Sequence, residues 1–363
     1  MQMISSQILQ NTLEGLKNIT RVNFSVMDPE GKEVAQTADM SECGNAAAAF
    51  AASPADSQEI SGHQFFKIFD EQQLEYLLVV EGSGEDVYTI GKLAAFQIQN
   101  LLVAYKERFD KDNFVKNLLL DNLLLVDIYG RSKKLHIQSD APRIVYVVEN
   151  SNSKDNNVLE LTRTFFGTSG KDFVTAVDES SVVVVKDLTG ADPVKETQRT
   201  AKSLSSYLAK ENVENIRIAY GTVVQEIKDV SRSYKEAKMA ADVGRIFFDE
   251  KDVVAYSELG IGRLIYQLPL PLCKMFIKEI FGGKNPEDFD DETLPTINKF
   301  FENSLNVSET SRQLFIHRNT LVYRLDKLQK STGLDLRVFE DAITFKIALM
   351  VVKYMKYMES NNY

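Results

Sequence analysis

The sequence predicts an α+β multidomain protein whose C-terminal part is entirely helical. Its 363 residues exceed the roughly 150 residues typical of one domain, which favours several domains. Strand-like segments alternate with amphipathic helices up to about residue 260, and only helical patterns follow the glycine- and proline-containing residues 260–271. We therefore expect a domain at residues 1–105, a helical connector at 106–140, an α+β domain at 141–260 and a helical domain at 261–363.

The composition is that of a folded protein outside membranes. Hydrophobic residues make up 44% of the chain and charged residues 26%, both ordinary globular values. The apolar residues 181–185 are too few to cross a bilayer, and residues 343–352 are interrupted by Lys346. The N-terminus shows no secretory signal pattern. We expect a cytoplasmic location and no membrane partner.

Cysteine and histidine residues are few and scattered. Cys43 and Cys273 lie far apart without a CxxC spacing, and His63, His136 and His317 are equally separated. Metal sites and disulfide frameworks need clustered ligands. We expect no metal, no disulfide and no cofactor.

The first hundred residues predict a small sensor domain. A helix at residues 5–19 precedes two strands, 23–27 and 33–36, joined by Asp-Pro-Glu-Gly at 28–31, a sequence typical of a hairpin turn. A helix at 42–52 and two strands at 64–69 and 75–80 follow. This order of helix, hairpin, helix and hairpin predicts a PAS/GAF-like ligand-sensing domain at residues 1–105.

A long helix is predicted to follow, at residues 86–127. Its apolar side is expected to contain Ile90, Leu93, Phe96, Ile98, Leu101, Leu102 and Tyr105. The continuous apolar run at 118–125 is unusual for a solvated linker. It favours a subunit contact in a homodimer or higher homo-oligomer, and the alternative is packing within one subunit.

The middle of the chain predicts a second α+β domain. Strands are expected at residues 144–148, 173–177, 182–185 and 216–220, with helices at 158–166, 197–210 and 229–243. Antiparallel hairpins with helices between them indicate a ferredoxin-like or nucleotide-cyclase-like sheet.

Local charge indicates where nucleic acid could bind. The whole chain carries a net charge of −10, which argues against attraction over the whole surface. Between Arg312 and Lys330, however, five basic residues and one acid give a net charge of +4. In this region Ser308 is expected to cap a short helix at 309–314, and a second helix at 318–331 is expected to end at Gly333.

The second of these helices has two distinct faces. At about 100° per residue, Leu321, Leu325 and Leu328 form one buried stripe. The outer face carries Asn319, Tyr323 and Lys330, with Thr320 and Lys327 on one shoulder and Arg318 at the helix start. Asn can pair with adenine in a major groove, and Arg, Lys, Thr and Tyr reach phosphates or base edges. The alternative is an ordinary helical hairpin with a solvated basic face.

The residues 317–325, H-R-N-T-L-V-Y-R-L, and the following Thr332-Gly333 carry a family resemblance. They resemble the C-terminal helix-turn-helix of the CdaR/PucR regulators, whose pattern is H-R-N-T-L-x-Y-R-L with a later T-G. The resemblance implies a transcription regulator, commonly an activator, of catabolic operons that binds double-stranded DNA. The implied DNA-binding residues are Ser308, Thr310, Ser311, Arg312, His317, Arg318, Asn319, Thr320, Tyr323, Arg324 and Lys327. For Arg324 a phosphate contact and an internal ion pair are both open.

The resemblance extends toward the N-terminus. Residues 18–34 and 105–136 are similar to the sugar-diacid recognition domain and the connecting region of the CdaR group. The Arg-Ile-Gly and His-Glu-Gly elements of that group are not found after the first hairpin, so the resemblance does not identify a sugar diacid as the ligand. A small-molecule effector is still implied, and a carboxylate would need a cation such as His63 or Lys67. Either residue could instead be ordinary surface.

The middle domain resembles the degenerate GGDEF-like domain of the same regulators, through residues 218–221 (I-A-Y-G) and 233–237 (S-Y-K-E-A). A cyclase would need a Gly-Gly-Asp/Glu-Glu-Phe turn and acidic metal ligands, but residues 177–181 are V-D-E-S-S. We expect a regulator and not an enzyme. The alternatives are a signalling enzyme or nucleotide-binding receptor built on this domain, and an adaptor that uses the long helix.

Overall fold

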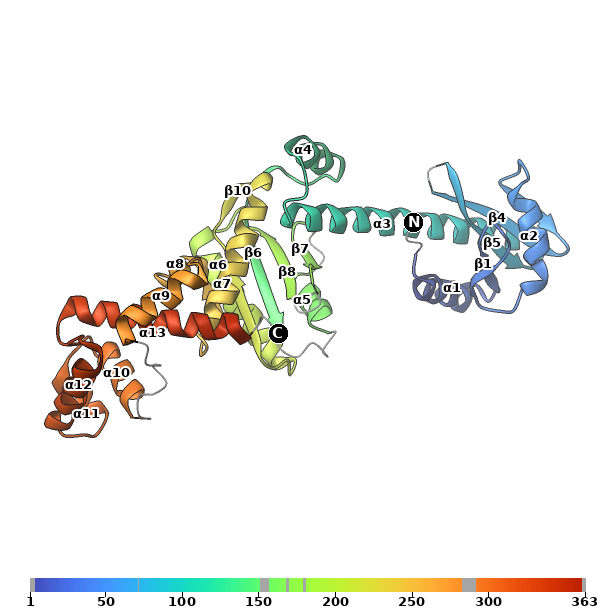
Figure 1. The fold of residues 1–363 in the computed structure, drawn as a ribbon. Helices are drawn as coiled ribbons and strands as arrows, with labels where there is room; N and C mark the ends of the chain where they lie inside the picture. The colour runs from blue at the N-terminus through green and yellow to red at the C-terminus, as the bar shows by residue number, and fades with distance from the viewer. Residues whose placement is uncertain are drawn as a thin grey trace. The chain divides into compact units, whose positions relative to one another are not determined.

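The computed structural model describes residues 4–70, 72–150, 157–167, 170–178, 181–282 and 292–360 (Figure 1). The chain forms two compact units, Met1–Phe114 and Val115–Tyr363. Both contain a β-sheet with helices on its faces, so the α+β multidomain class is confirmed. Within the described ranges, none of the helices combines the length and apolar character needed to cross a membrane.

The N-terminal unit is built on a five-stranded antiparallel sheet in the order β2-β1-β5-β4-β3. The strands are β1 (Phe24–Met27), β2 (Glu33–Gln36), β3 (Ser57–Ile60), β4 (His63–Asp70) and β5 (Gln73–Glu81). The first hairpin is confirmed: the Gly31 amide donates to the Asp28 carbonyl at 2.9 Å, and Gly31 has φ +85°. A Cβ atom at Gly31 would lie 2.1 Å from the Gly44 carbonyl oxygen, so the turn requires glycine. Strand β3, which is mostly polar, was not predicted.

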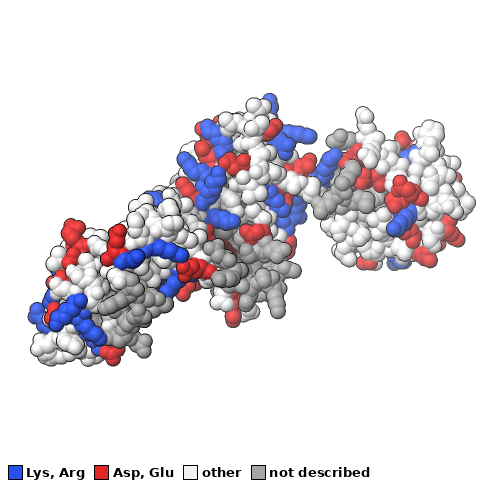
Figure 2. Space-filling view, in the orientation of Figure 1, with Lys and Arg blue, Asp and Glu red and all other residues white. Residues whose placement is uncertain are grey.

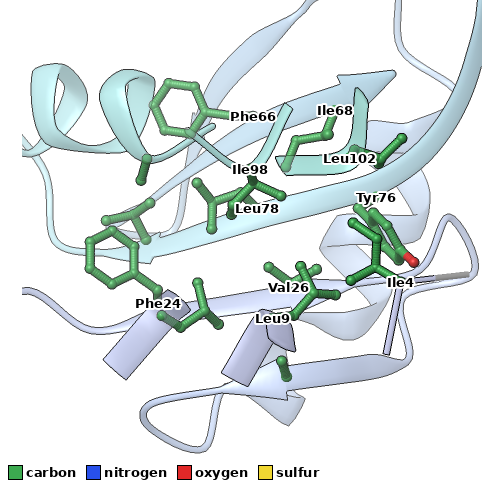
Figure 3. Packing of buried hydrophobic residues seen from close by; sticks show 14 residues of the cluster. Ile4, Leu9, Phe24, Val26, Phe66, Ile68, Tyr76, Leu78, Ile98 and Leu102 are labelled. Carbon is green, nitrogen blue, oxygen red and sulfur yellow. The ribbon is translucent and has the colours of Figure 1, made fainter. Parts of the chain in front are cut away.

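Helices cover both faces of this sheet. Helix α1 (Ser6–Thr20) and the first part of α3 (Glu85–Leu119) pack on one face, and the cluster includes Leu9, Val26, Leu78, Ile98 and Leu102 (Figure 3). The 3₁₀ turn η1 (Ser41–Cys43) and α2 (Gly44–Ala51) cover the other face, where Met27, Phe50, Phe65, Leu77 and Val79 are buried. The alternation of strand side chains between the two faces therefore builds two small cores.

The long helix differs from its prediction in two ways. It ends at Leu119 instead of residue 127, and α4 (Leu125–Lys134) begins after a break. Asp121 adopts a left-handed φ of 61°, and the Asn122 amide donates back to the Asn117 carbonyl, which closes the helix end. The predicted apolar face was also partly wrong, because Leu93 and Phe96 are exposed.

The predicted buried run 118–125 is divided by this break. Leu118 and Leu119 are 3% and 0% exposed inside the chain, whereas Leu124 and Leu125 are 74% and 59% exposed. The run is therefore not one continuous surface, and Leu119 cannot contact a second subunit in this structure.

The second unit contains a six-stranded sheet in the order β11-β9-β6-β8-β7, with β10 also paired to β6. Its strands are β6 (Asp140–Asn150), β7 (Phe173–Ala176), β8 (Ser181–Asp187), β9 (Ile216–Tyr220), β10 (Val224–Glu226) and β11 (Val253–Ala255). All pairs are antiparallel except β11 with β9. This is the ferredoxin-like arrangement that the sequence predicted, since the central strand β6 lies between β8 and β9.

Helices again cover the sheet. Helices α5 (Val158–Phe166) and α6 (Pro193–Lys210) pack over Tyr146, Val148 and Val184, and α7 (Val230–Phe247) packs with β9 and β11 through Ala219 and Val254. The motifs at residues 218–221 and 233–237 meet at a tight contact. A Cβ atom at Gly221 would lie 2.1 Å from the Ser233 carbonyl oxygen, so glycine is needed there. The Ser233 hydroxyl accepts from the Val145 amide at 3.1 Å and donates to the Thr222 carbonyl at 2.8 Å.

Among the residues described after β11, the regular elements are all helical, as predicted. After the 3₁₀ turns η2 (Ile227–Asp229) and η3 (Tyr256–Glu258), the helices are α8 (Gly262–Tyr266), α9 (Leu270–Phe281), α10 (Thr293–Glu302), α11 (Val307–Gln313), α12 (Arg318–Thr332) and α13 (Phe339–Ser360). Helix α13 belongs to two clusters. Phe345 and Ala348 pack with α10 and α12, whereas Val351 and Tyr354 pack with Ile246 of α7.

Candidate DNA interface

Helix α11 begins two residues earlier than predicted. Its N-cap is Asn306, whose Oδ1 accepts from the Glu309 amide at 3.0 Å, so the expected cap at Ser308 was wrong. Ser308 is exposed on the first turn. Thr310 is 0% exposed and Ser311 is 7% exposed, and the Ser311 hydroxyl donates to the Ser308 carbonyl. Burial keeps Thr310 and Ser311 from reaching DNA, so the structure removes both from the expected contact set.

Helix α12 has the predicted buried stripe. Leu321, Leu325 and Leu328 are 0%, 2% and 2% exposed and belong to one cluster with Phe300 and Phe345. This stripe holds the helix in place by burying apolar area. His317 caps the helix through its Nδ1 atom, which accepts from the Asn319 amide at 3.2 Å, and Gly333 ends it with φ +79°. His317 thus has a structural role at the start of the helix.

The outer face of α12 presents polar groups to solvent at its N-terminal end. Arg318, Asn319, Thr320 and Tyr323 are exposed, and Lys327 and Lys330 continue this exposed face toward the C-terminus. Within the described residues, the side chains of Arg318 and Asn319 make no ion pair or hydrogen bond. Figure 2 shows Lys and Arg side chains gathered over α11 and α12, at the lower left. The unpaired side chains of Arg318 and Asn319 therefore lie at the N-terminal end of α12, the part of a recognition helix that normally contacts bases.

Two arginines of the expected set have partners within the protein. Arg324 donates to Thr296 Oγ1 at 2.8 Å and to Glu292, and its side chain is 22% exposed. Of the two possibilities left open for Arg324, the structure shows the internal ion pair. Arg312 is 76% exposed but pairs with Glu309 at 2.7 Å. The hydrogen bond from Arg312 holds the pKa of the Glu309 carboxyl below its ordinary value.

One acid near this face is neutralised by a base outside the predicted motif. Asp326 lies 2.9 Å from Arg337, which also pairs with Asp335 at 2.7 Å. The hydrogen bond from Arg337 lowers the pKa of the Asp335 carboxyl. Asp326 therefore repels a DNA phosphate less than the net charge counted over residues 312–330 suggests.

The turn between α11 and α12 contains an exposed aromatic residue that the sequence pattern did not predict. Phe315 is 96% exposed and has a left-handed φ of 54°. A bulky residue rarely adopts this conformation, which suits glycine or asparagine. Its neighbour Ile316 packs against the core of the domain, so the aromatic ring points away while the backbone turns. The only sequence signal was an aromatic residue placed between the two predicted helices.

The two cations suggested for an N-terminal effector are engaged within their own unit. The Lys67 ammonium donates to the Ser53 carbonyl and lies 5.1 Å from the centre of the Phe50 ring. His63 Nδ1 lies 3.1 Å from the Ser61 carbonyl oxygen. Because the Lys67 ammonium is held by these contacts, the structure does not bring the two cations together as an anion site.

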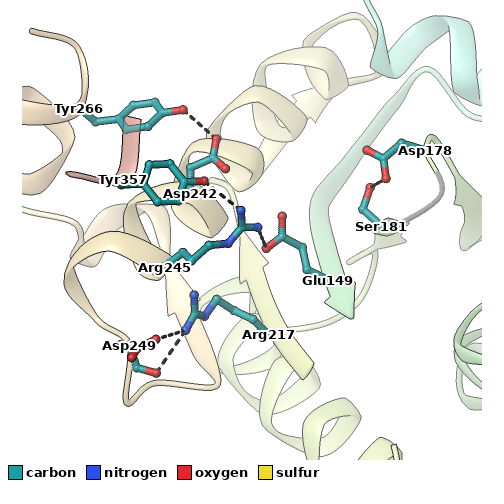
Figure 4. Close-up of polar contacts among 9 residues, drawn as sticks. All are labelled: Glu149, Asp178, Ser181, Arg217, Asp242, Arg245, Asp249, Tyr266 and Tyr357. Carbon is teal, nitrogen blue, oxygen red and sulfur yellow. Dashed lines mark hydrogen bonds and ion pairs between the residues drawn. The ribbon is translucent and has the colours of Figure 1, made fainter. Parts of the chain in front are cut away.

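In the middle domain, the carboxylates near the end of β6 are hydrogen-bonded to other side chains. Arg245 of α7 donates to Glu149 at 2.6 Å, and the Ser181 hydroxyl donates to Asp178 at 2.7 Å (Figure 4). Glu179 and Ser180 of the predicted turn lie outside the described residues. Among the described residues, no group of three or more His, Cys, Asp or Glu side chains is placed to hold a metal ion.

Comparison with known proteins agrees with this geometry. Residues 293–351 match the PucR C-terminal helix-turn-helix domain, and residues 124–243 match the GGDEF-like domain. The carbohydrate diacid regulator of Escherichia coli (strain K12) is 22% identical over 297 residues, which cover 77% of each chain. The purine catabolism regulatory protein of Bacillus subtilis (strain 168) is 25% identical over 135 residues, 37% of this chain and 25% of that one.

A solved structure is also similar. The regulator of polyketide synthase expression from Bifidobacterium adolescentis shares 16% sequence identity, with 68% of this chain and 92% of that chain covered and a TM-score of 0.34.

The C-terminal domain match and the exposed outer face of α12 define a DNA-binding transcription regulator. In its middle and C-terminal domains the chain is similar to the CdaR/PucR regulators.

Proposed function

We propose that this protein is a ligand-responsive activator of a catabolic operon and that it reads its operator through the N-terminal end of α12. The observation that carries the proposal is the division of α12 into a buried leucine stripe and an exposed face bearing Arg318, Asn319, Thr320 and Tyr323. Asn319 suits bidentate pairing with adenine, and Arg318 suits guanine or phosphate. Names of relatives such as the purine catabolism regulatory protein and the proline-responsive transcriptional activator PutR support a catabolic target and activation.

Other exposed residues complete the proposed contact set. Ser308, His317 and Lys327 lie on exposed parts of α11 and α12, and Arg312 reaches outward beside Glu309. These groups fit contacts with the phosphate backbone, which position a protein without reading sequence. Arg324 is left out because its guanidinium is already bound to Glu292 and Thr296.

The N-terminal unit is proposed as the PAS/GAF-like sensor for a small-molecule effector. Its support is the sheet order β2-β1-β5-β4-β3, with α1 and α3 on one face and α2 on the other. The carbohydrate diacid regulator among the relatives makes a carboxylate effector the first to test. The middle domain is proposed to be a non-catalytic GGDEF-like domain, because Glu149 is bound by Arg245 instead of being open toward a metal.

The interface is tested with the Arg318→Ala and Asn319→Ala variants and with DNA from the protein's own upstream promoter. Each variant should lose about 1–3 kcal/mol of specific binding free energy in fluorescence anisotropy, with an unchanged circular dichroism spectrum. Arg131→Ala, an exposed arginine on α4, is the matched control and should bind as the parent does. Parent-like operator affinity in both recognition-helix variants would show that this face does not read DNA.

The effector is tested on the same DNA. Titration with a panel of diacids and amino acids should change operator affinity for at least one compound, and removal of residues 1–84 should abolish that change. If the truncated chain responds as the full chain does, the sensor assignment is wrong.

A further inference from the structure

The outward face of α3 in the N-terminal unit carries an unusual row of exposed apolar side chains. Leu93 is 64% exposed, Phe96 is 65% exposed and Val103 is 55% exposed. The opposite face of the same helix packs on the sheet through Ala94, Ile98 and Leu102. Exposed large apolar residues are ordinary when scattered, but here they lie together on one side of one helix.

The spacing of this row is that of a coiled-coil seam. Positions 93, 96, 100 and 103 are related as i, i+3, i+7 and i+10, so they occupy successive a and d positions of a heptad. Three of the four are apolar, and the fourth, at an a position, is Asn100. A single asparagine at an a position is the feature that fixes register and favours two parallel strands. We call positions 93, 96, 100 and 103 the α3 seam.

We propose that the α3 seam pairs in parallel with the α3 seam of a second copy of this chain, with the two Asn100 amides facing each other. This deepens the proposed function, because a dimer supplies the second helix-turn-helix that a two-half-site operator needs. A twofold contact uses the same patch on both subunits, and the seam satisfies this requirement on its own. In an antiparallel pair Asn100 would face an apolar side chain and lose its hydrogen-bonding partner.

Charges around the seam agree with self-pairing. Between positions 92 and 104 the flanking residues are Lys92, Gln97, Gln99 and Ala104, and Lys92 would lie near Gln97 of the second copy in a parallel pair. No like charges therefore meet beside the apolar side chains. Acidic residues occupy positions 86 and 107, the a positions of the heptad before and after the α3 seam, so the two helices are expected to separate at these positions.

The size of the seam sets the strength of the dimer. Coiled coils that are stable alone need about three to four heptads, and the α3 seam spans fewer than two. Four residues per helix are far fewer than the roughly 20–30 residues per partner of a standard interface. We therefore expect a dimer that dissociates on dilution and is strengthened on DNA, where the second half-site raises the effective concentration.

A competing exposed surface provides a matched control. Leu124, Leu125 and Val126 are 74%, 59% and 83% exposed at the start of α4. They are consecutive in sequence, so they point in different directions around the helix start and do not form a seam. Charge at Val126 should leave the dimer unchanged.

The first experiment measures assembly of the full chain without DNA by sedimentation velocity over a range of concentrations. The parent should shift from monomer to dimer, the double variant Leu93→Glu, Phe96→Glu should stay monomeric, and Val126→Glu should behave as the parent. Asn100→Leu should tighten association by roughly tenfold or more, because it removes a polar group from the seam. Since these side chains are exposed, unfolding midpoints should not fall. A parent that stays monomeric throughout, or a double variant that dimerises normally, overturns the proposal.

The second experiment tests the parallel register. Asn100→Cys, treated with diamide as the oxidant of the two thiols, should form an inter-subunit disulfide, while Val126→Cys should not. The native Cys43 and Cys273 are buried and do not interfere. Dimers that form without cross-linking at position 100 would refute the parallel pairing.

The two proposals fail separately. Arg318→Ala should keep the dimer and lose the operator, whereas the Leu93→Glu, Phe96→Glu variant should keep weak half-site binding and lose the dimer. If the Leu93→Glu, Phe96→Glu variant binds a two-half-site operator as tightly as the parent, then the α3 seam does not join the two subunits that bind the operator. This conclusion holds even if the seam dimer forms in solution.

Discussion

Arg245 of α7 donates a hydrogen bond to the hydroxyl of Tyr357 on α13 at 2.9 Å. The same guanidinium binds Glu149 at the end of β6 at 2.6 Å, so one side chain joins the central strand of the middle domain to the last helix of the chain (Figure 4). The first half of α13 packs with α12. The position of α12 therefore depends on contacts made by the middle domain.

The Arg245→Met variant should lower the free energy of unfolding by about 1 kcal/mol, since it removes two hydrogen bonds of a half-exposed charge and leaves Glu149 without a cation. Urea unfolding followed by circular dichroism measures this loss. Arg245→Lys keeps the charge but cannot bind both partners, so it should fall between the parent and Arg245→Met. An unchanged midpoint for Arg245→Met would mean that the contact is not formed in solution.

Arg324→Ala should destabilise the C-terminal domain by about 1–2 kcal/mol, because Glu292 and Thr296 lose their partner. It should weaken binding to specific and non-specific DNA by the same factor, since it acts through the fold. Arg318→Ala, by contrast, should leave stability unchanged and reduce only specific binding. Thermal unfolding, together with binding to the operator and to an unrelated DNA sequence, separates these effects. If Arg324→Ala lost only its binding to the operator, Arg324 would contact the DNA directly.

Phe315→Gly should raise the free energy of unfolding by roughly 0.5–1 kcal/mol. Glycine removes the cost of about 1–2 kcal/mol that a side chain has in the left-handed conformation, and part of this gain is cancelled because glycine makes the unfolded chain more flexible. The ring is 96% exposed, so its removal loses almost no packing. Phe315→Ala is the control and should show no gain, since alanine keeps the Cβ atom. The thermal unfolding midpoint measures both, and a loss of stability in Phe315→Gly would mean that the ring packs in solution.

The two thiols should resist labelling in the folded protein. Burial raises the pKa of Cys43 and of Cys273, so each holds less thiolate at a given pH than a free cysteine. The folded state therefore holds the thiol protons more tightly than the unfolded state does. The free energy of unfolding should fall as the pH rises above the ordinary pKa of a thiol and toward the raised pKa of the folded state. Ellman's reagent at neutral pH should react with both thiols only after denaturant is added. Rapid labelling of the native protein would contradict their burial.

The purified protein should form no cyclic dinucleotide from GTP and Mg²⁺. Residues 177–181 lack the glycines of a cyclase turn, and the Glu149 carboxylate is bound to Arg245. Chromatography of the reaction mixture, with an active diguanylate cyclase as the positive control, measures the product. Formation of any cyclic dinucleotide would favour the signalling-enzyme alternative.

Local patterns in the sequence were sufficient for most elements and for the helix-turn-helix domain. The hairpin at 28–31, the strand at Ile216–Tyr220, the helix at Val158–Phe166 and the leucine stripe of α12 were predicted, because turn chemistry and periodicity act over a few residues. The motif that begins at His317 located the helix-turn-helix domain for the same reason. The predictions of which side chains are buried failed where burial depends on contacts between distant segments.

The tertiary structure alone decided which polar residues of the motif are available. Thr310 and Ser311 are buried by the packing of α11, and Arg324 is taken by Glu292 across the domain. Leu93 and Phe96 face solvent because Gly91 and Ala94 pack against the sheet; a Cβ atom at Gly91 would lie 2.3 Å from Phe66. Periodicity shows that a helix has an apolar side, but which side is buried depends on the surface it meets, and only the folded chain supplies that surface.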